Sequence, residues 1–332
     1  MVSSKDVAKK ANVSQSTVSR VMNQPHKVNP VTRNKVLEVI KNLNYRPNSI
    51  ARSLVSKETM SIALISGQLH NPFFAESTTS IVEFANSKGF SVNVHFDDLQ
   101  DNLNVYQDVL NQQVDGIILS SILYNDPIYD ELINQDVPFV MFNRKNKNIG
   151  NFVEMDNFKA GFLGAECLIE NNHQEIIWIG GALSTSTFYG RHTGFLAALD
   201  KHNLSIQEAN TIITDTTEND VHDKIIRVMA RKNRPTAIFA ATDSIALYIM
   251  DILSRHGFHI PQDISIVGVD NVSYSSHGNI QLSTIGIVEE DNLGKIAIEY
   301  LIDLINDKNK SLGVIQKTID TKLINRGTIR KV

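Results

Sequence analysis

The sequence predicts a small all-α head followed by an α/β body that contains two parallel sheets. Two observations lead to this fold class. Residues 1–46 show helical periodicity, with polar capping residues before each apolar stripe. From residue 61 onward, short apolar runs alternate with amphipathic segments, which is typical of βαβ units. Residues 59–332 are enough for two such sheets.

The charge distribution sets the head apart from the body. The chain has 332 residues and a net charge of -4. Residues 1–60 carry eleven Lys and Arg but three Asp and Glu, so their net charge is +8 and that of the remainder is -12. A basic segment on an acidic body is the asymmetry of a nucleic-acid-binding module joined to another domain.

The composition also limits the compartment. The chain has one cysteine, Cys167, so it forms no internal disulfide, which fits a reducing environment. The first residues show no apolar signal segment, and no apolar run reaches membrane-spanning length. We expect a cytoplasmic protein without membrane contact, and a buried Cys167.

Three helices are expected in the head. Ser4 can cap a helix that runs to Ala11, and Ser14 can cap a second helix over residues 15–23. Asn29 and Pro30 open a third helix, since proline is favoured at the first helical position. Its apolar stripe consists of Val36, Leu37, Ile40 and Leu43. The short turn between the first two helices indicates a helix-turn-helix unit.

The second helix has a face suited to reading DNA. Val18, Val21 and Met22 form its apolar stripe, and the opposite face carries Gln15, Ser16, Ser19 and Arg20. Gln and Arg can bond base edges in pairs of hydrogen bonds, and Ser and Thr can bond phosphates. The alternative is a small helical bundle with a polar face. Charge, turn spacing and polar face together favour DNA.

The stretch after the head is weakly helical. It begins at Pro47 and offers about two turns, too few for a helix that is stable alone. Ile50 and Leu54 lie four apart and therefore share a face, with Arg46 and Arg52 nearby. Such a segment can fold against the DNA minor groove, where an apolar side chain wedges between base steps. The alternative is an ordinary solvated linker.

Ordered motifs in the head resemble the lac repressor/purine repressor family of bacterial regulators. They are residues 6–8, 13–23, 32–36 (through Thr32, Arg33, Lys35 and Val36), 45–48 and 51–54. The resemblance implies that Gln15, Ser16 and Arg20 touch bases and that Thr17 and Asn23 touch the DNA backbone. It also implies a DNA-binding hinge helix that includes Asn48 and Arg52 and places Leu54 as the minor-groove wedge.

The resemblance also implies a domain plan. The head covers residues 1–46, the hinge 47–58, and an effector-binding and dimerisation domain 59–332. That domain resembles a two-lobed periplasmic-binding-protein-like fold whose chain crosses between the lobes more than once. One lobe takes residues 59–156 and 287–316, and the other takes 157–286 and 317–332.

The pattern of the body predicts its elements. The expected strands are residues 61–66, 90–96, 115–121, 138–142, 175–180, 236–240 and 264–269. The expected helices are residues 72–88, 102–113, 157–171, 189–202, 220–232 and 243–256. Residues 317–328 are expected to form a closing strand pair.

Ligands bind beyond the carboxyl ends of parallel strands, so the residues there are candidates for an effector site. Carboxylates and arginines can chelate sugar hydroxyls, and aromatic rings can cover apolar faces. The candidates that match effector-contacting positions in the family are Phe73, Phe74, Asp156, Arg191, Thr242 and Asp270. Each has a structural alternative: a helix cap for the two aspartates, a surface ion pair for Arg191, and core packing for the phenylalanines.

Two departures from the family bear on the ligand. Thr242 stands where many members have asparagine, and Asp215 is followed by Thr216 where many have an aromatic residue. The second departure removes a ring that would stack on a flat ligand, which disfavours a purine.

No enzymatic motif is present. The chain lacks the G-x-x-x-x-G-K-[ST] phosphate loop and the G-x-G-x-x-G dinucleotide fingerprint. His256 and His259 have no further partners at metal-ligand spacing, so solvated histidines are expected. We therefore predict no catalytic residue, no metal and no cofactor.

The predicted function is a ligand-gated, sequence-specific DNA-binding transcription regulator, a repressor, of carbohydrate or related metabolism genes. The expected partners are palindromic operator DNA, a sugar-like effector and a second copy of the chain, because such heads read half-sites about one helical turn apart. One alternative is a regulator gated by a protein co-regulator, as in catabolite-control members of the family. A sugar-binding or sugar-processing protein is the second alternative.

Overall fold

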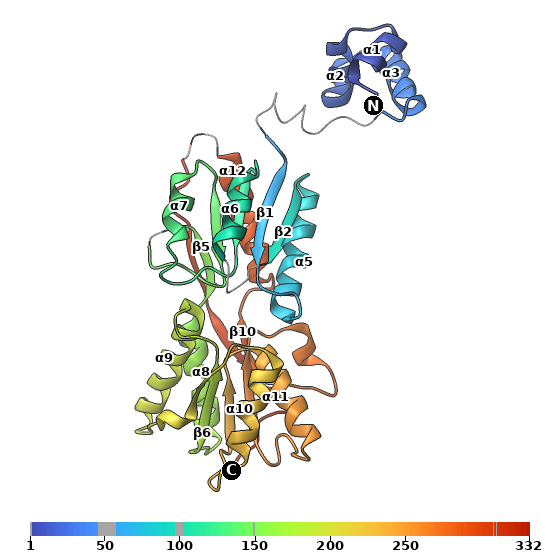
Figure 1. Cartoon of the computed structure of the whole chain (residues 1–332). Coiled ribbons are helices and arrows are strands. Elements are labelled where there is room, and N and C mark those ends of the chain that lie inside the picture. The colour runs from blue at the N-terminus through green and yellow to red at the C-terminus, as the bar shows by residue number, and fades with distance from the viewer. Residues whose placement is uncertain (1, 46–57, 97–101, 149, 308, 310) are drawn as a thin grey trace. The chain divides into compact units, whose positions relative to one another are not determined.

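The computed structural model describes residues 2–45, 58–96, 102–148, 150–307, 309 and 311–332. The chain divides into two compact units, Met1–Thr59 and Met60–Val332 (Figure 1). Each unit has its own apolar core. The elements of the first unit are all helical, and those of the second alternate between strands and helices, as the sequence predicts.

The described residues of the first unit form three α-helices, α1 (Ser4–Ala11), α2 (Gln15–Asn23) and α3 (Pro30–Asn42), with a short 3-10 turn η1 (Pro25–Lys27). The Ser14 side chain caps α2 by accepting from the Thr17 N–H, and Asn29 caps α3 ahead of Pro30. The three helices bury a common cluster that contains Val7, Ala8, Ala11, Val18, Val21 and Val36.

Two details of the head differ from the sequence prediction. Ser3, not Ser4, caps α1: its hydroxyl accepts from the Asp6 N–H while the Asp6 carboxylate accepts from the Ser3 N–H at 2.8 Å. This reciprocal capping box requires an acidic or amide residue three positions after the cap, and Asp6 has that spacing from Ser3. Leu37 is 46% exposed, since the buried stripe of α3 contains Val36 and not its neighbour.

The first sheet of the body has the strand order β11-β5-β4-β3-β1-β2, and all neighbours are parallel. Its strands are β1 (Ser61–Ser66), β2 (Ser91–Phe96), β3 (Gly116–Leu119), β4 (Phe139–Phe142), β5 (Phe152–Met155) and β11 (Gln316–Ile319). The helices of this lobe are α5 (Pro72–Ser87), α6 (Asn102–Asn111), α7 (Ile128–Asn134) and α12 (Leu293–Asn306). The strands β3 and β4 are buried along their whole length, because helices cover both faces.

The second sheet repeats this topology with the order β12-β10-β9-β8-β6-β7, in which only the β10–β12 pair is antiparallel. Its strands are β6 (Ile176–Gly180), β7 (Thr211–Ile213), β8 (Ala237–Ala240), β9 (Ser265–Val269), β10 (Ser283–Ile287) and β12 (Thr321–Ile324). The helices of this lobe are α8 (Asn157–Glu170), α9 (Ser186–Lys201), α10 (Glu218–Met229) and α11 (Asp243–Arg255), with short 3-10 turns η2 (Glu208–Asn210) and η3 (Ser273–Ser276).

The chain passes between the two lobes three times: from β5 to α8, from β10 to α12, and from β11 to β12. Residues 317–328 do contain two strands, but the prediction that these strands pair with each other is wrong. Strand β11 adds to the first sheet beside β5, and β12 adds to the second sheet beside β10. The last crossing falls at Asp320, later than the expected boundary at residues 316/317.

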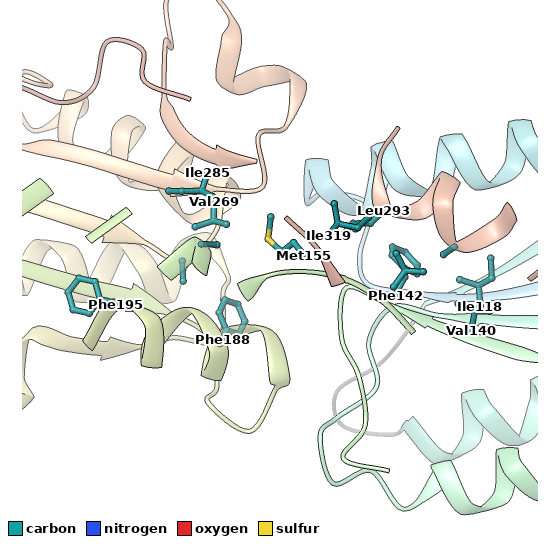
Figure 2. Close-up of a cluster of buried hydrophobic side chains, with 14 of the residues drawn as sticks. Ile118, Val140, Phe142, Met155, Phe188, Phe195, Val269, Ile285, Leu293 and Ile319 are labelled. Carbon is teal, nitrogen blue, oxygen red and sulfur yellow. The ribbon is translucent and has the colours of Figure 1, made fainter. Parts of the chain in front are cut away.

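An apolar cluster runs through the crossing region and joins the two lobes (Figure 2). Met155, Ile319 and Leu293 lie on or beside the three crossing segments and are at most 3% exposed. They are continuous with Phe142 in the first lobe and Phe188 in the second. Cys167 is buried in the second lobe, as expected.

Several elements were not expected from the sequence. They are α7, β5, β7, β10 and α12. The three strands have at most five residues, too few for a clear alternation. In contrast, α12 has a readable helical pattern, with Leu293, Ala297, Ile298, Leu301 and Ile302 buried on one face.

Candidate functional site

The exposed face of α2 carries the side chains predicted to read DNA. Gln15, Ser16 and Arg20 are exposed and Thr17 is half-buried. Val18 and Val21 on the opposite face are at most 2% exposed and pack against α1 and α3. Burial of this apolar stripe fixes which face of α2 points outward, so the polar residues are presented together.

Hydrogen bonds restrict several of these side chains. The Ser14 hydroxyl lies 2.8 Å from the hydroxyls of both Ser16 and Thr17 at the start of α2. The Gln15 side-chain amide donates to the Ser4 hydroxyl of α1 at 2.8 Å. Gln15 is thus held against the preceding helix, which orders it before a partner arrives.

The remaining DNA-binding candidates are not located. Asn23 is the last residue of α2, and its side chain lies outside the described part of the structure. Asn48, Arg52 and Leu54 also lie outside the described residues.

In the body, a small cavity of about 60 Å³ lies between the two lobes. Residues that follow β1, β4, β6, β7, β8 and β9 reach it, all from the carboxyl ends of parallel strands. Its lining is Asn71, Phe73, Phe74, Asn143, Arg144, Thr187, Phe188, Arg191, Thr216, Thr242, Ser244, Ile245 and Asp270. We refer to it as the interlobe cleft. It unites five of the six effector candidates.

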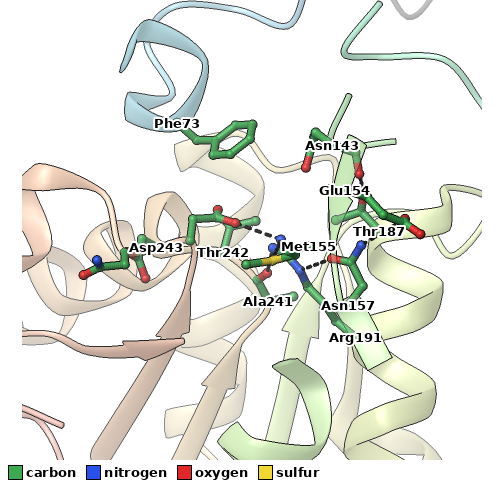
Figure 3. Close-up of polar contacts among 12 residues, drawn as sticks. Phe73, Asn143, Glu154, Met155, Asn157, Thr187, Arg191, Ala241, Thr242 and Asp243 are labelled. Carbon is green, nitrogen blue, oxygen red and sulfur yellow. Dashed lines mark hydrogen bonds and ion pairs between the residues drawn. The ribbon is translucent and has the colours of Figure 1, made fainter. Parts of the chain in front are cut away.

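Arg191 is the centre of the polar network in the cleft (Figure 3). It is 1% exposed and its guanidinium donates to the Asp270 carboxylate at 2.8 Å. Further donor contacts go to the side-chain oxygen of Asn157 at 3.0 Å, the carbonyl of Ala241 at 2.5 Å and the sulfur of Met155 at 3.0 Å. Four of the five N–H groups of Arg191 are thus engaged by the protein.

Asp270 retains an acceptor for a ligand. Its side chain is 5% exposed, and Arg191 contacts only one of its two oxygens among the described residues. Burial raises the pKa of Asp270, and the neighbouring Arg191 charge opposes that rise. Within the described part of the chain, one oxygen of Asp270 and one N–H group of Arg191 have no hydrogen-bond partner, and both residues line the cleft.

A second buried carboxylate lies behind Asp270. Burial, followed by the charge of Asp270, raises the pKa of Asp243 to about 7. Its two oxygens accept from the Thr284 hydroxyl at 2.5 Å and the Val272 N–H at 3.0 Å. Asp243 thereby fixes the loop that follows Asp270. It does not line the cleft.

The two adjacent phenylalanines have different surroundings. Phe74 is 9% exposed and its ring packs on the Gly67 backbone, where an added Cβ would lie 2.3 Å from the ring. Phe73 is half-buried and its ring meets that of Phe74 edge-on at 5.3 Å between centroids. Phe73 therefore forms an aromatic wall of the cleft (Figure 3), and the Phe74 ring supports it from behind by the edge-on contact.

Asp156 is the candidate that the structure does not bring to the cleft. Its carboxylate caps α8 by accepting from the Lys159 N–H at 2.8 Å. Thr242 also has a capping role, since its hydroxyl accepts from the Ile245 N–H at 3.2 Å, but it lines the cleft as well.

Residues beyond the six effector candidates also line the cleft. Asn143, Thr187 and Thr216 line the cleft. Thr216 is the position at which many members of the family have an aromatic residue. Asn143, Thr216 and Asp270 have positive φ angles of 65°, 68° and 122°. Non-glycine residues rarely adopt such angles, and backbone strain of this kind gathers at functional sites. Asn143 and Asp270 directly follow β4 and β9, and that position was the available signal for them.

An acidic cavity of about 130 Å³ adjoins the cleft and shares Phe73 and Asp270 with it. Glu76, Glu289, Glu290 and Asp291 also line this cavity. Glu76 accepts from the Ser273 N–H and hydroxyl at 2.9 and 2.6 Å, and Asp291 pairs with Lys295 at 2.7 Å. The acidic surroundings disfavour an anionic ligand.

Within the described ranges, no group of three or more His, Cys, Asp or Glu side chains could hold a metal ion. His256 and His259 are exposed, as expected. Among the described helices, none is long and apolar enough to cross a membrane.

Comparison with known proteins identifies the family. Residues 4–48 match the family described as bacterial regulatory proteins, lacI family, and residues 165–329 match a periplasmic binding protein-like domain. The HTH-type transcriptional repressor PurR of Serratia proteamaculans (strain 568) is 33% identical over 99% of this chain and 97% of its own length. The chain belongs to the lacI family.

Solved structures agree with this assignment. The lac repressor dimer bound to operator and the anti-inducer ONPF shares 28% identity and a TM-score of 0.85, with 98% of each chain covered. The fold is therefore a helix-turn-helix head with a two-lobed periplasmic-binding-like body. As a lacI-family member with repressor relatives, the chain is a DNA-binding transcription regulator and not an enzyme.

Proposed function

We propose that this regulator is a repressor controlled by a neutral, hydroxyl-rich effector, a sugar or sugar derivative, that binds in the interlobe cleft. The observation that carries this proposal is the Arg191–Asp270 pair, which offers one acceptor and one donor to a cleft with the Phe73 ring on its wall. A donor–acceptor pair suits neighbouring hydroxyls, and a ring suits the apolar face of a sugar.

The charge around the cleft narrows the ligand class. Four carboxylates line the adjoining cavity in addition to Asp270, so phosphorylated sugars are disfavoured relative to neutral ones. Thr216 supplies no ring at its place in the cleft, so a flat purine lacks a stacking partner on that side. Both features support a neutral carbohydrate.

The test for the effector is thermal unfolding of the full chain against a panel of neutral sugars, sugar phosphates and purines. A ligand that binds only the folded state raises the midpoint with its concentration. We expect a neutral sugar to raise the midpoint and Phe73→Ala to remove that rise. A response confined to phosphates or purines would contradict the ligand class.

The DNA-reading role of α2 has its own test. Arg20 and Gln15 are presented on the exposed face of α2, and each can bond a base edge through two hydrogen bonds. We propose that Arg20→Ala weakens binding to operators selected from a random duplex library by about 1–3 kcal/mol and relaxes preference at one base position. Uniform weakening across all sequences would instead assign Arg20 to phosphate contact.

We also propose the domain plan in which residues 1–46 read DNA, 47–58 form a hinge helix on it, and 59–332 bind effector and dimerise. The solved lac repressor dimer bound to operator supports a homodimer on operator DNA. We propose that this operator is palindromic and that the protein acts in the cytoplasm. Leu54→Ala should weaken operator binding but leave unchanged the rise in the thermal unfolding midpoint that the effector causes. Unchanged operator affinity would remove the wedge role from Leu54.

A regulator gated by a protein co-regulator is the alternative. It predicts that no small molecule raises the thermal unfolding midpoint. It also predicts that the co-regulator protein changes the operator binding of Phe73→Ala as it does that of the unchanged chain.

A further inference from the structure

A larger cavity, of about 610 Å³, lies at the β5–α8 crossing and is separate from the interlobe cleft. We name it the hinge-side pocket, because it lies beside the crossing segments that join the two lobes; the name does not refer to the hinge at residues 47–58. Its lining is Tyr124, Asn125, Lys145, Glu154, Asp156, Asn157, Phe158, Leu183, Ser184, Thr185, Ser186, Tyr189, Gly190, Thr193 and Thr318. No residue of this set lines the cleft. The volume is in the range of sites that hold small ligands.

Two hydrogen bonds between the lobes separate the pocket from the cleft. The Thr187 hydroxyl donates to the Asn143 carbonyl at 2.9 Å, and the Lys145 N–H donates to the Ser186 hydroxyl at 3.0 Å. Asn143 and Thr187 line the cleft, whereas Lys145 and Ser186 line the hinge-side pocket. Residues 143–145 and 186–187 therefore form a wall with one cavity on each side.

The walls of the hinge-side pocket combine rings with polar groups. Tyr124, Phe158 and Tyr189 are 43%, 51% and 59% exposed, although side chains of this size are usually more buried. Tyr124 belongs to the first lobe and the other two rings to the second. Around them lie the Asn125 amide, the Ser184 hydroxyl and the Asp156 carboxylate. Rings beside polar groups match a ring-shaped ligand with hydroxyls on its edge.

One charge pair lies in this pocket, with its carboxylate buried and its lysine half-buried. Glu154 is 5% exposed and forms an ion pair with Lys145. Burial raises the pKa of Glu154, and Lys145 opposes that rise. Because the two charges compensate each other, the pair offers donors and acceptors without net charge, which favours a neutral ligand.

The charge pair is connected to the cleft through Asn157. The Asn157 side-chain amide donates to Glu154 at 3.4 Å, and its oxygen accepts from Arg191 at 3.0 Å (Figure 3). Arg191 in turn holds Asp270. A ligand that moves Glu154 would thus act on the side chains that bind effector.

We propose that the hinge-side pocket is a second ligand site, which takes a neutral oligosaccharide of two or more rings and influences the cleft through Glu154, Asn157 and Arg191. The binding claim stands on the pocket alone. The influence on the cleft rests on the effector role proposed above.

The test is calorimetric titration of the full chain with maltose and cellobiose, which are neutral two-ring probes. We expect saturable binding of at least one probe, weakened about tenfold by Tyr189→Ala because the variant loses one stacked ring. Tyr274→Ala is the matched control, because Tyr274 is 50% exposed and lies outside both cavities. It should leave the titration unchanged.

The Phe73→Ala variant distinguishes binding in the cleft from binding in the hinge-side pocket, because Phe73 lines only the cleft of these two cavities. If this variant retains probe binding while losing the midpoint shift caused by the cleft effector, the pocket is an independent site. The proposal is overturned if neither probe binds, or if binding is lost in Phe73→Ala and kept in Tyr189→Ala. The last result would place the disaccharide in the cleft and leave the effector proposal intact.

Discussion

Arg191 is both a candidate ligand contact and a residue that holds several elements of the body together. Its guanidinium joins β5 and α8 at Met155 and Asn157, the end of β8 at Ala241, and the end of β9 at Asp270. Removing its charge leaves Asp270 buried without its partner. A lost sugar response in an Arg191 variant would therefore not distinguish ligand contact from disturbed structure.

We predict that Arg191→Met lowers the free energy of unfolding of the body by about 3–5 kcal/mol, the usual cost of breaking a buried ion pair from one side. Chemical denaturation followed by circular dichroism measures this. Arg255→Met is the control, because the Arg255–Asp251 pair is exposed and should contribute about 0.5 kcal/mol. Equal effects of the two substitutions on the free energy of unfolding would contradict the stabilising role of Arg191.

Asp243 makes stability depend on pH. Its pKa is about 7 in the folded chain, against 3.8 for an unperturbed aspartate, so the folded state binds the proton more tightly. Between pH 4 and pH 7 the unfolded chain loses this proton first, and the free energy of unfolding falls as pH rises. The contribution is about 2–4 kcal/mol at most.

We expect Asp243→Asn to flatten this fall between pH 4 and pH 7, because the asparagine does not titrate. Denaturation midpoints across that range measure the difference from the unchanged chain. Asp223→Asn serves as the control, since the Asp223 side chain is 69% exposed. Parallel pH profiles for the unchanged chain and Asp243→Asn would show that Asp243 is ionised throughout.

At the scale of elements, the approach of α8 and α9 positions the cleft network. A Cβ on Gly161 would lie 1.9 Å from the Arg191 carbonyl, and one on Gly194 would lie 1.9 Å from the Phe158 carbonyl. Only glycine allows this backbone contact. It brings Asn157 of α8 within hydrogen-bonding distance of Arg191 of α9.

We predict that Gly161→Ala and Gly194→Ala each destabilise the body by about 1–3 kcal/mol, the cost of overpacking a tight contact. Each should also weaken effector binding, because the Asn157–Arg191 contact is displaced. Gly278→Ala is the control: an added Cβ there meets nothing within 4 Å. Thermal midpoints with and without ligand give both quantities, and unchanged midpoints would argue against the close packing.

At the scale of the whole molecule, charge separates the two functions. The basic head binds a polyanion, whereas the acidic body disfavours non-specific attachment to it. The expected result is a steep salt dependence: with about six phosphate contacts, affinity for operator falls roughly 10³-fold between 50 and 200 mM salt. Fluorescence anisotropy on a selected operator measures the slope. A flat dependence would contradict phosphate contact by the head.

The two lobes are joined by three crossing segments with buried Met155, Ile319 and Leu293 between them. Residues of both lobes line the cleft and the hinge-side pocket, so a ligand in either proposed site would favour one lobe arrangement over another by its difference in affinity. The coupling between sites is reciprocal: an effector that weakens operator binding is itself bound more weakly on operator.

The sequence by itself determined the three helices of the head, the βαβ alternation of the body and the family motifs. These depend on local periodicity, caps such as Ser14 and Asn29, and apolar runs. It also placed Phe73, Arg191, Thr242 and Asp270 after strands. Since parallel strands bring their carboxyl ends to one edge, those residues meet in the cleft.

Tertiary structure decided what local pattern does not contain. Strands β11 and β12 are neighbours in sequence but belong to different sheets, because their partners β5 and β10 are distant along the chain. Asp156 and Asp270 both follow strands, yet only Asp270 reaches the cleft, because the fold directs Asp156 to cap α8. The partners of Arg191 come from β5, α8 and the ends of β8 and β9, which are distant along the chain and meet only in the folded body. The hinge-side pocket has residues of both lobes in its lining and exists only once the lobes pack together.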